Sequence, residues 1–168
     1  MTRFEQFQQN VQRWATERGI YEHSTALAQA LKAVSEVGEL CDAVIKNDRD
    51  ALVDAIGDTA VTLINAGHFY HHEWDVEYIY DNEKSDRPLA ECAAAISKVC
   101  GDLASEVAGL DMAGATKGEL LDMVMFSLYG TSLVAGLDFD DCCESAWQTI
   151  KDRRGKMVAG GAFVKEGE

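Results

Sequence analysis

Four acidic residues at helical spacing are the part of this sequence best suited to chemistry. Glu36 and Glu39 form an i, i+3 pair, and Asp54 and Asp58 form an i, i+4 pair after a polar break at 46–50. Each pair therefore lies on one face of a helix. Two helices joined by a short loop lie antiparallel, so the four carboxylates are expected to converge around a cation, and oxygen ligands suit Mg²⁺ or Mn²⁺ rather than zinc. Because such ions most often handle phosphate groups, the pattern predicts metal-dependent phosphate chemistry.

The simpler interpretation of these acids is a solvated helix face, which is common for acidic residues three or four apart. Here the neighbouring positions are apolar or small, so the acids are expected to be partly buried and to need a partner. Lys32 is the one basic residue within a turn of the first pair, which makes a metal the better partner. Gly38 and Gly57 lie beside the acids and reduce helix stability. A close approach of two backbones would explain them.

The elements that position these residues are predicted to be helical almost throughout. Apolar spacing and capping residues predict seven helices and a final extended arm: 2–18, 24–46, 48–72, 76–83, 88–108, 116–135, 138–155, and the arm 155–168. Pro88 is expected in the first turn of the fifth helix. At 168 residues the chain is long enough for one compact domain and too short for two ordinary ones. The predicted fold class is therefore all-α.

An internal repeat is visible between the two halves of the helical region. Segments align without a gap as follows: 27–37 with 89–99, and further on 52–54 with 120–122. Lys98 takes the place of Glu36, and Phe126 takes the place of Asp58. We interpret this as a duplicated helical hairpin whose second copy has lost the acids, which predicts a four-helix bundle with pseudo-twofold symmetry. A chance match between two alanine-rich amphipathic helices is the alternative.

Composition limits the classes of partner and compartment. The net charge of −14 argues against nucleic-acid binding, because a polyanion would be repelled. No apolar run approaches the roughly 20 residues needed to span a bilayer, and the first residues do not resemble a signal peptide. The five cysteines are odd in number and lie in amphipathic contexts, which favours free thiols in a reducing compartment. We therefore expect a cytoplasmic protein with no membrane partner.

The acidic segments resemble a known family. Residues 30–40 (ALKAVSEVGEL) followed by 54–58 (DAIGD) resemble the MazG-like, all-α nucleoside triphosphate pyrophosphohydrolases, whose signature is ExxE, a loop and ExxD. Further segments resemble short MazG-like proteins common in bacteriophages: 11–14, 18–20, 146–157 and 163–166. The resemblance covers residues 4–70 and 137–166. One departure is Ala55, which stands where the second motif has glutamate, so Asp54 must supply that carboxylate or the site has one ligand fewer.

The resemblance implies a domain organisation and a set of site residues. It implies one MazG-like domain with a four-helix-bundle core, divided as follows: 1–168 overall, 27–72 the catalytic hairpin, 88–135 the degenerate repeat, and 138–168 a basic helix and C-terminal arm. Two or three Mg²⁺ or Mn²⁺ ions are expected on four metal ligands, three of which are also catalytic: Glu36, Glu39 and Asp58, with Asp54 as the fourth ligand. Substrate contacts are expected from Trp14, Lys32, Lys151 and Arg154.

Two of these substrate contacts have an alternative explanation. Lys151 and Arg154 belong, with Arg153 and Lys156, to the one dense basic cluster of an acidic chain, and are the two members favoured as substrate contacts. Such a cluster can clamp a triphosphate, or it can merely complement the negative pole of a helix. Trp14 is either a stacking platform for a base or a core residue.

The predicted reaction converts a nucleoside triphosphate to the monophosphate and pyrophosphate, by attack of a metal-activated water on the α-phosphorus. Analogy with phage enzymes that reshape deoxynucleotide pools favours a purine substrate, dGTP or dATP, in the host cytoplasm. The alternatives are a hydrolase of alarmones such as guanosine tetraphosphate, and a non-catalytic helical oligomer with a decayed site.

A homo-oligomer, a tetramer or a dimer, is expected because two helices carry apolar residues on more than one stripe. These residues are Ala60, Val61, Leu63 and Ile64 in one helix, and Met123, Val124, Phe126 and Leu128 in the other.

Overall fold

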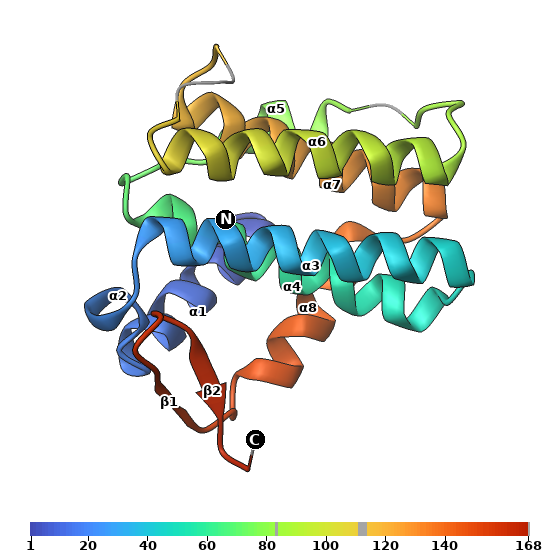
Figure 1. Cartoon of the computed structure of the whole chain (residues 1–168). Coiled ribbons are helices and arrows are strands. Elements are labelled where there is room, and N and C mark those ends of the chain that lie inside the picture. The colour runs from blue at the N-terminus through green and yellow to red at the C-terminus, as the bar shows by residue number, and fades with distance from the viewer. Residues whose placement is uncertain (83, 111–113, 168) are drawn as a thin grey trace.

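The computed structural model describes residues 1–82, 84–110 and 114–167, and it is all-α apart from a short C-terminal β-hairpin (Figure 1). Eight helices lie in the described residues: α1 (Arg3–Glu17), α2 (Ile20–His23), α3 (Ala26–Lys46), α4 (Arg49–His68), α5 (Val76–Tyr80), α6 (Leu89–Val107), α7 (Lys117–Ala135) and α8 (Phe139–Ile150). Two strands follow, β1 (Gly155–Met157) and β2 (Phe163–Lys165), which pair antiparallel with Lys156 opposite Val164. The predicted all-α fold class is confirmed.

The α3–α4 hairpin is set by its two-residue turn. Asn47 ends α3 in the left-handed conformation, with φ of 53°, which asparagine tolerates. Asp48 then caps α4 by accepting a hydrogen bond from the Ala51 amide at 3.1 Å. Because the turn is this short, the two long helices lie antiparallel and side by side (Figure 1). The face of α3 that bears Glu36 is thereby brought next to the face of α4 that bears Asp58.

Helix α4 lies at the centre of the molecule and contacts α1, α3, α7 and α8. A Cβ atom on Gly57 would lie 2.5 Å from the carbonyl oxygen of Cys142 on α8, so only glycine allows the two backbones to approach this closely. The predicted explanation for Gly57 is therefore confirmed. The same explanation is wrong for Gly38, where an added Cβ would meet no heavy atom of the described chain within 4 Å.

The remaining helices cover the first hairpin from two sides. The α6–α7 hairpin packs on α3, while α1 and α8 pack on α4 (Figure 1). Within the described residues no single helix is long and apolar enough to cross a membrane, and α7 with α8 meets that test only as a pair bent by 106°. The bundle class and the internal duplication stay predictions.

Two differences from the predicted elements affect the site. The sequence predicts the last helix to reach residue 155, whereas α8 ends at Ile150. The predicted extended arm is a β-hairpin that returns to the body of the molecule, where the hydroxyl of Ser24 donates a hydrogen bond to the Gly161 carbonyl at 2.6 Å. A further helix, α2, occupies a segment predicted as a turn.

Candidate functional site

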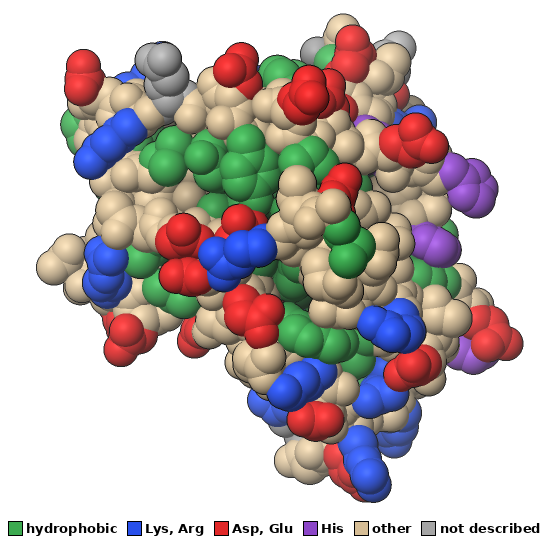
Figure 2. Space-filling view, turned by 180° about the vertical axis from the view of Figure 1, so that it is seen from behind, with side chains coloured by type: hydrophobic (Ala, Val, Ile, Leu, Met, Phe, Trp, Pro, Cys, Tyr) green, Lys and Arg blue, Asp and Glu red, His purple; other side chains and the backbone are tan. Residues whose placement is uncertain are grey.

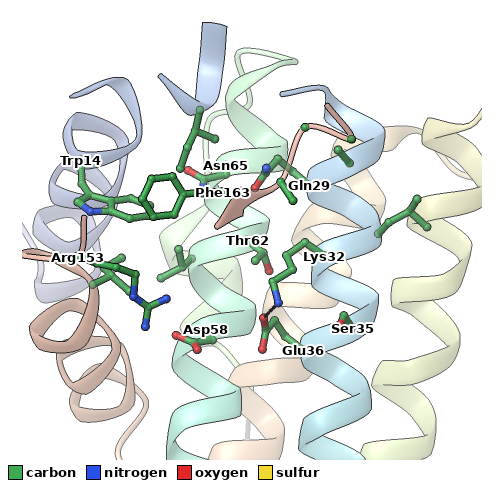
Figure 3. A pocket seen from close by; sticks show the side chains of 18 residues that line it. Trp14, Gln29, Lys32, Ser35, Glu36, Asp58, Thr62, Asn65, Arg153 and Phe163 are labelled. Atoms are coloured by element: carbon green, nitrogen blue, oxygen red, sulfur yellow. Dashed lines mark ion pairs between the residues drawn. The ribbon is translucent and has the colours of Figure 1, made fainter. Parts of the chain in front are cut away.

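A cavity of about 370 Å³ opens between the facing sides of α3 and α4 (Figure 3). Its other walls come from Trp14 on α1, Arg153 beyond the end of α8, and the C-terminal hairpin. Lys32, Glu36 and Asp58 lie toward one end of the cavity, and aromatic and amide side chains lie toward the other (Figure 3). A concave site of this volume is of the size that holds a small molecule.

Glu36 and Asp58 form the acidic pair of this cavity. Glu36 is only 5% exposed, and Lys32 donates a hydrogen bond from Nζ to Glu36 Oε1 at 2.6 Å. Burial and the negative charge of Glu36 raise the pKa of Asp58 from 3.8 to about 6, against the opposing charge of Arg153. The charge of Asp58 is thus incompletely compensated, and a further cation would be attracted to it.

Lys32 remains positively charged in this setting. Its partial burial disfavours the charged form, but the hydrogen bond to Glu36 and the surrounding carboxylates hold the pKa of Lys32 above its ordinary value of 10.5. The side chain is 53% exposed, so its ammonium group lies at the mouth of the acidic end. It can therefore move between Glu36 and an incoming anion at little cost in burial.

Arg153 supplies positive charge from the opposite wall. Its backbone is fixed because Arg18 donates a hydrogen bond from Nε to the Arg153 carbonyl at 2.9 Å. Figure 3 shows its guanidinium directed toward Asp58 across the cavity. Among the residues that the structure describes, this guanidinium has no ion-pair partner, so it can bind an anion held between the two walls.

Glu39 and Asp54 lie on a second hollow of about 220 Å³, which shares Asp58 with the cavity. Both are exposed, unlike Glu36, and Ala55 lines the same hollow. The four predicted carboxylates therefore lie along two neighbouring hollows with Asp58 common to both. As the side chains stand, no group of three or more His, Cys, Asp or Glu residues in the described chain is close enough to hold one metal ion.

The structure brings two of the four predicted substrate-contacting residues to the cavity and leaves two outside it. Trp14 and Lys32 line the cavity, and the Trp14 ring lies edge to face with Phe163, 5.7 Å between centroids. Lys151, which follows the last residue of α8, donates a hydrogen bond to Gln148 on that helix, and Arg154 is exposed beside the C-terminal hairpin. Neither of these two lines the cavity.

The helix end accounts for this difference. If α8 continued to residue 155, Lys151 and Arg154 would share one face at i, i+3 spacing. Because α8 ends at Ile150, the chain turns, and Arg153 faces the cavity instead. The basic cluster was visible in the sequence, but the side chain that faces the acids depends on a helix boundary that the apolar pattern does not define.

Two amide residues of the cavity were also missed from the sequence. Gln29 precedes Glu36 by seven residues on α3, and Asn65 follows Asp58 by seven residues on α4. Seven residues are two helical turns, so each amide lies on the same face as its acid. Polar residues at this spacing in otherwise apolar helices were the signal that could have identified them.

A short segment of the chain is similar to a phage protein. Over 64 residues, 38% of this chain, it is 39% identical to an uncharacterized 18.2 kDa protein from the rep-hol intergenic region of Haemophilus phage HP1 (strain HP1c1). The matched segment spans 39% of the phage protein's length. No protein-family model matches the chain, and no solved structure does.

Proposed function

We propose that this protein is a metal-dependent nucleoside triphosphate pyrophosphohydrolase of the MazG-like kind. The observation that carries the proposal is the acidic pair Glu36 and Asp58, held at one end of a closed-sided cavity between the basic groups of Lys32 and Arg153. Acids alone would repel a polyphosphate, and bases alone would bind it without activating water. Their combination in one cavity suits an anion that is bound through metal ions.

The residues fit a hard divalent cation by their chemistry. Glu36, Glu39, Asp54 and Asp58 offer only carboxylate oxygens, which Mg²⁺ and Mn²⁺ prefer. The raised pKa of Asp58 marks a carboxylate whose burial and acidic neighbours are not fully offset by Arg153 and Lys32. Two or three ions on these residues would supply a water of lowered pKa and neutralise phosphate oxygens. Lys32 donates to Oε1 of Glu36, and an ionised carboxylate keeps further lone pairs for a cation.

The chain's own basic and aromatic groups would orient the substrate. The guanidinium of Arg153 and the ammonium of Lys32 approach the acidic pair from two walls, so they can hold phosphate oxygens on either side of it. Trp14 and Phe163 line the cavity and contact each other edge to face, so they offer apolar surface to the substrate. Positioning and electrostatic stabilisation of this kind supply most of the catalysis in phosphoryl transfer.

The proposed substrates are deoxynucleoside triphosphates, with dGTP and dATP first, in the cytoplasm of a bacterial host. Similarity to a phage protein supports a phage setting, in which control of the deoxynucleotide pool would be useful. The test is product analysis of each dNTP, each NTP and guanosine tetraphosphate with Mg²⁺ or Mn²⁺. Release of monophosphate and pyrophosphate supports the proposal. Cleavage of the tetraphosphate alone would favour the alarmone hydrolase, and no cleavage at all would favour a non-catalytic bundle.

We further propose that the protein is a homo-oligomer, a tetramer or a dimer. The predicted stripe on α4 does not support this, because Ala60, Val61, Leu63 and Ile64 are all buried within the chain. The stripe on α7 supports it only in part, because Val124 and Leu128 are also buried. Support comes from Tyr78 on α5 and Met123 on α7, which are each 40% exposed. Figure 2 shows hydrophobic side chains gathered on the upper half of one face, over these helices. Light scattering that gives a monomer mass of 18.4 kDa at micromolar concentration would refute the proposal.

A further inference from the structure

Two buried amide side chains, Gln29 on α3 and Asn65 on α4, face the end of the cavity away from the acids (Figure 3). Their side chains are 6% and 2% exposed. Buried amides cost free energy unless their hydrogen bonds are satisfied. The protein supplies a hydrogen-bond partner for only one of the two polar atoms of each amide. That partner determines which atom is left for a ligand.

Gln29 is left with a free acceptor. Its Nε2 donates a hydrogen bond to Ser24 Oγ at 2.9 Å, and that hydroxyl in turn donates to the Gly161 carbonyl at 2.6 Å. The Ser24 hydroxyl can donate only one proton, and the carbonyl of Gly161 takes it. The amide nitrogen of Gln29 is therefore held toward Ser24. Its Oε1, which no described residue contacts as a donor, remains to accept a hydrogen bond.

Asn65 is left with a free donor. Its Oδ1 accepts a hydrogen bond from the Tyr21 hydroxyl at 2.9 Å. Tyr21 is itself fixed, because its ring stacks on His68 with 3.5 Å between centroids. The burial of Tyr21 raises the pKa of its phenol, so the hydroxyl keeps the proton that it donates. Within the described chain, Asn65 Nδ2 has no acceptor, and its two hydrogens are available to a ligand.

The distance from these amides to the acids suits one extended ligand. Gln29 and Asn65 are each two helical turns, about 10.5 Å along the axis, from Glu36 and Asp58 respectively. Trp14 and Phe163 line the cavity next to the amides and offer aromatic surfaces (Figure 3). An aromatic wall beside a free donor and a free acceptor is the combination that recognises a flat heterocycle with polar edges.

We propose that Gln29 and Asn65 recognise the base of the substrate through its hydrogen-bonding edge, with Ser24 and Tyr21 as positioning residues. This inference rests on the proposed function, since that function supplies the phosphate end of the ligand. The free acceptor of Gln29 and the free donor of Asn65 together require a base that offers an N–H next to an acceptor. Guanine N1–H with O6, thymine or uracil N3–H with O4, adenine N6–H with N1 and cytosine N4–H with N3 all satisfy it, whereas N1-methylguanine and N3-methylthymine do not.

The first test uses nucleosides, which lack phosphate, with metal-free protein. We expect the preferred deoxynucleoside to shift the side-chain amide signals of Asn65 and Gln29 in ¹⁵N NMR spectra. A single methyl group at N1 of guanine or N3 of thymine, or two methyl groups on the exocyclic amine of adenine or cytosine, keeps the stacking surface but removes the N–H, and is expected to weaken binding by about tenfold or more. Equal binding of the methylated nucleoside, or no shift with any nucleoside, would overturn the inference.

Variants separate recognition from folding. Asn65→Leu and Gln29→Met preserve side-chain size and remove one hydrogen-bonding group each, so each is expected to weaken nucleoside binding about tenfold. Gln9→Met, an exposed amide on α1, is the matched control and should bind normally. Melting temperatures establish that each variant is folded. Wild-type binding by folded Asn65→Leu and Gln29→Met proteins would contradict the inference.

Tyr21→Phe tests the positioning role. Without the hydroxyl, the Asn65 amide can present either atom to the base. We expect the ratio of affinities between the best and the worst nucleoside to fall several-fold, while a merely structural role would change stability and leave the ratio intact. An unchanged ratio in a folded Tyr21→Phe protein would remove the role assigned to this hydroxyl.

The two proposals fail separately. If nucleosides bind at these amides but no triphosphate is cleaved, the proposed function fails and base recognition stands. If triphosphates are cleaved and Asn65→Leu leaves the relative KM values of the four dNTPs unchanged, base recognition fails and the proposed function stands.

Discussion

The two long hairpins, α3–α4 and α6–α7, are built from helices of nearly equal length but differ in what lies against them. The first pairs helices of 21 and 20 residues through a two-residue turn, and the second pairs two helices of 19 residues through segment 108–116. Helix α4 is covered on its far side by α1, α8 and the C-terminal segment, which leave a cavity beside it. The corresponding space beside α7 is filled by α5.

The aligned side chains follow this difference. Lys98, which aligns with Glu36, is exposed and forms an ion pair with Asp102 at 2.6 Å. Phe126, which aligns with Asp58, stacks on Tyr78 with 4.8 Å between ring centroids. A position that faces a cavity in one hairpin thus carries an acid, and the same position packed against a helix in the other carries an aromatic ring. The elements that pack on each hairpin, α1 and α8 on the first and α5 on the second, therefore decide more than the hairpin itself whether a site can exist.

The largest expected effect concerns turnover. Glu36→Gln and Glu39→Gln each keep side-chain size and remove one anionic oxygen ligand, so each is expected to lower the rate of triphosphate cleavage by about 100-fold or more. Lys98→Gln, at the aligned position of the second hairpin, should cleave at the wild-type rate. Activity near wild type in either glutamine variant would show that the first hairpin does not hold the active site.

Metal binding should distinguish the hairpins without any reaction. Mn²⁺ added to the metal-free protein is expected to broaden NMR signals around Glu36, Glu39 and Asp58, because unpaired electrons relax nearby nuclei. Signals from 90–110 and 114–126 should broaden less, and least far from the α3 contact, since α6 packs on α3 but Lys98 and Phe126 offer no carboxylate. Broadening centred on the second hairpin would contradict the assignment of a single acidic site.

Stability of the metal-free protein should respond oppositely to loss of one acid in each hairpin, Asp58 in the first and Asp122 in the second. The pKa of Asp58 in the folded state, about 6, lies above its ordinary value of 3.8. Its protonated form therefore contributes stability that is complete below pH 3.8 and is lost as the pH rises through 6. We expect Asp58→Asn to raise the free energy of unfolding at pH 7 by up to about 3 kcal/mol, with less gain at pH 5.

The second hairpin provides the control for this measurement. Asp122 Oδ1 lies 2.9 Å from His72 Nε2, where it holds the loop after α4 against α7. It aligns with Asp54 but has a protein partner, so Asp122→Ala should lower the free energy of unfolding by about 1 kcal/mol. Urea titrations in the presence of a chelator measure both variants. A loss of stability in Asp58→Asn at pH 7 would mean that Asp58 is already compensated by the protein.

Two glycines of the first hairpin should respond in opposite directions, and Gly38 gives the smallest expected effect. Gly57→Ala forces a Cβ into the Cys142 carbonyl and Ala146, and should destabilise by about 1–3 kcal/mol. Gly38→Ala meets open space in the described chain and should stabilise by about 0.5–1 kcal/mol through helix propensity. Thermal unfolding of the two variants shows whether each substitution raises or lowers stability. Destabilisation by Gly38→Ala would indicate that another subunit covers this face.

The sequence predicted the helices and the acidic faces because these depend on local spacing. Apolar periodicity located seven of the eight described helices, and the residue spacing put Glu36 and Asp58 on facing sides of one hairpin. Most of the apolar residues around the acids are also buried, although Val34 is exposed. These properties depend on residues within one or two turns of a helix, where backbone geometry fixes the direction of each side chain.

The walls of the cavity could not be predicted in the same way. Arg153 and Phe163 reach the cavity because α8 ends early and the following chain pairs as a β-hairpin, and neither event has a strong local signal. The four acids line two hollows instead of one. Glu36 is buried and Glu39 is exposed although they lie on one helix face, and the sequence pattern does not distinguish them. Such features arise from contacts between distant segments.

The contact between Trp14 and Phe163 joins two residues that are separated by most of the chain. Closing so long a loop has a large entropic cost, whereas the α3–α4 turn needs only local contacts. In refolding, helical circular dichroism should therefore recover before the fluorescence of Trp14 reaches its native value. We expect the acidic face to form together with the α3–α4 hairpin. The cavity walls that come from α1 and the C-terminal hairpin should form last in folding and separate first in unfolding.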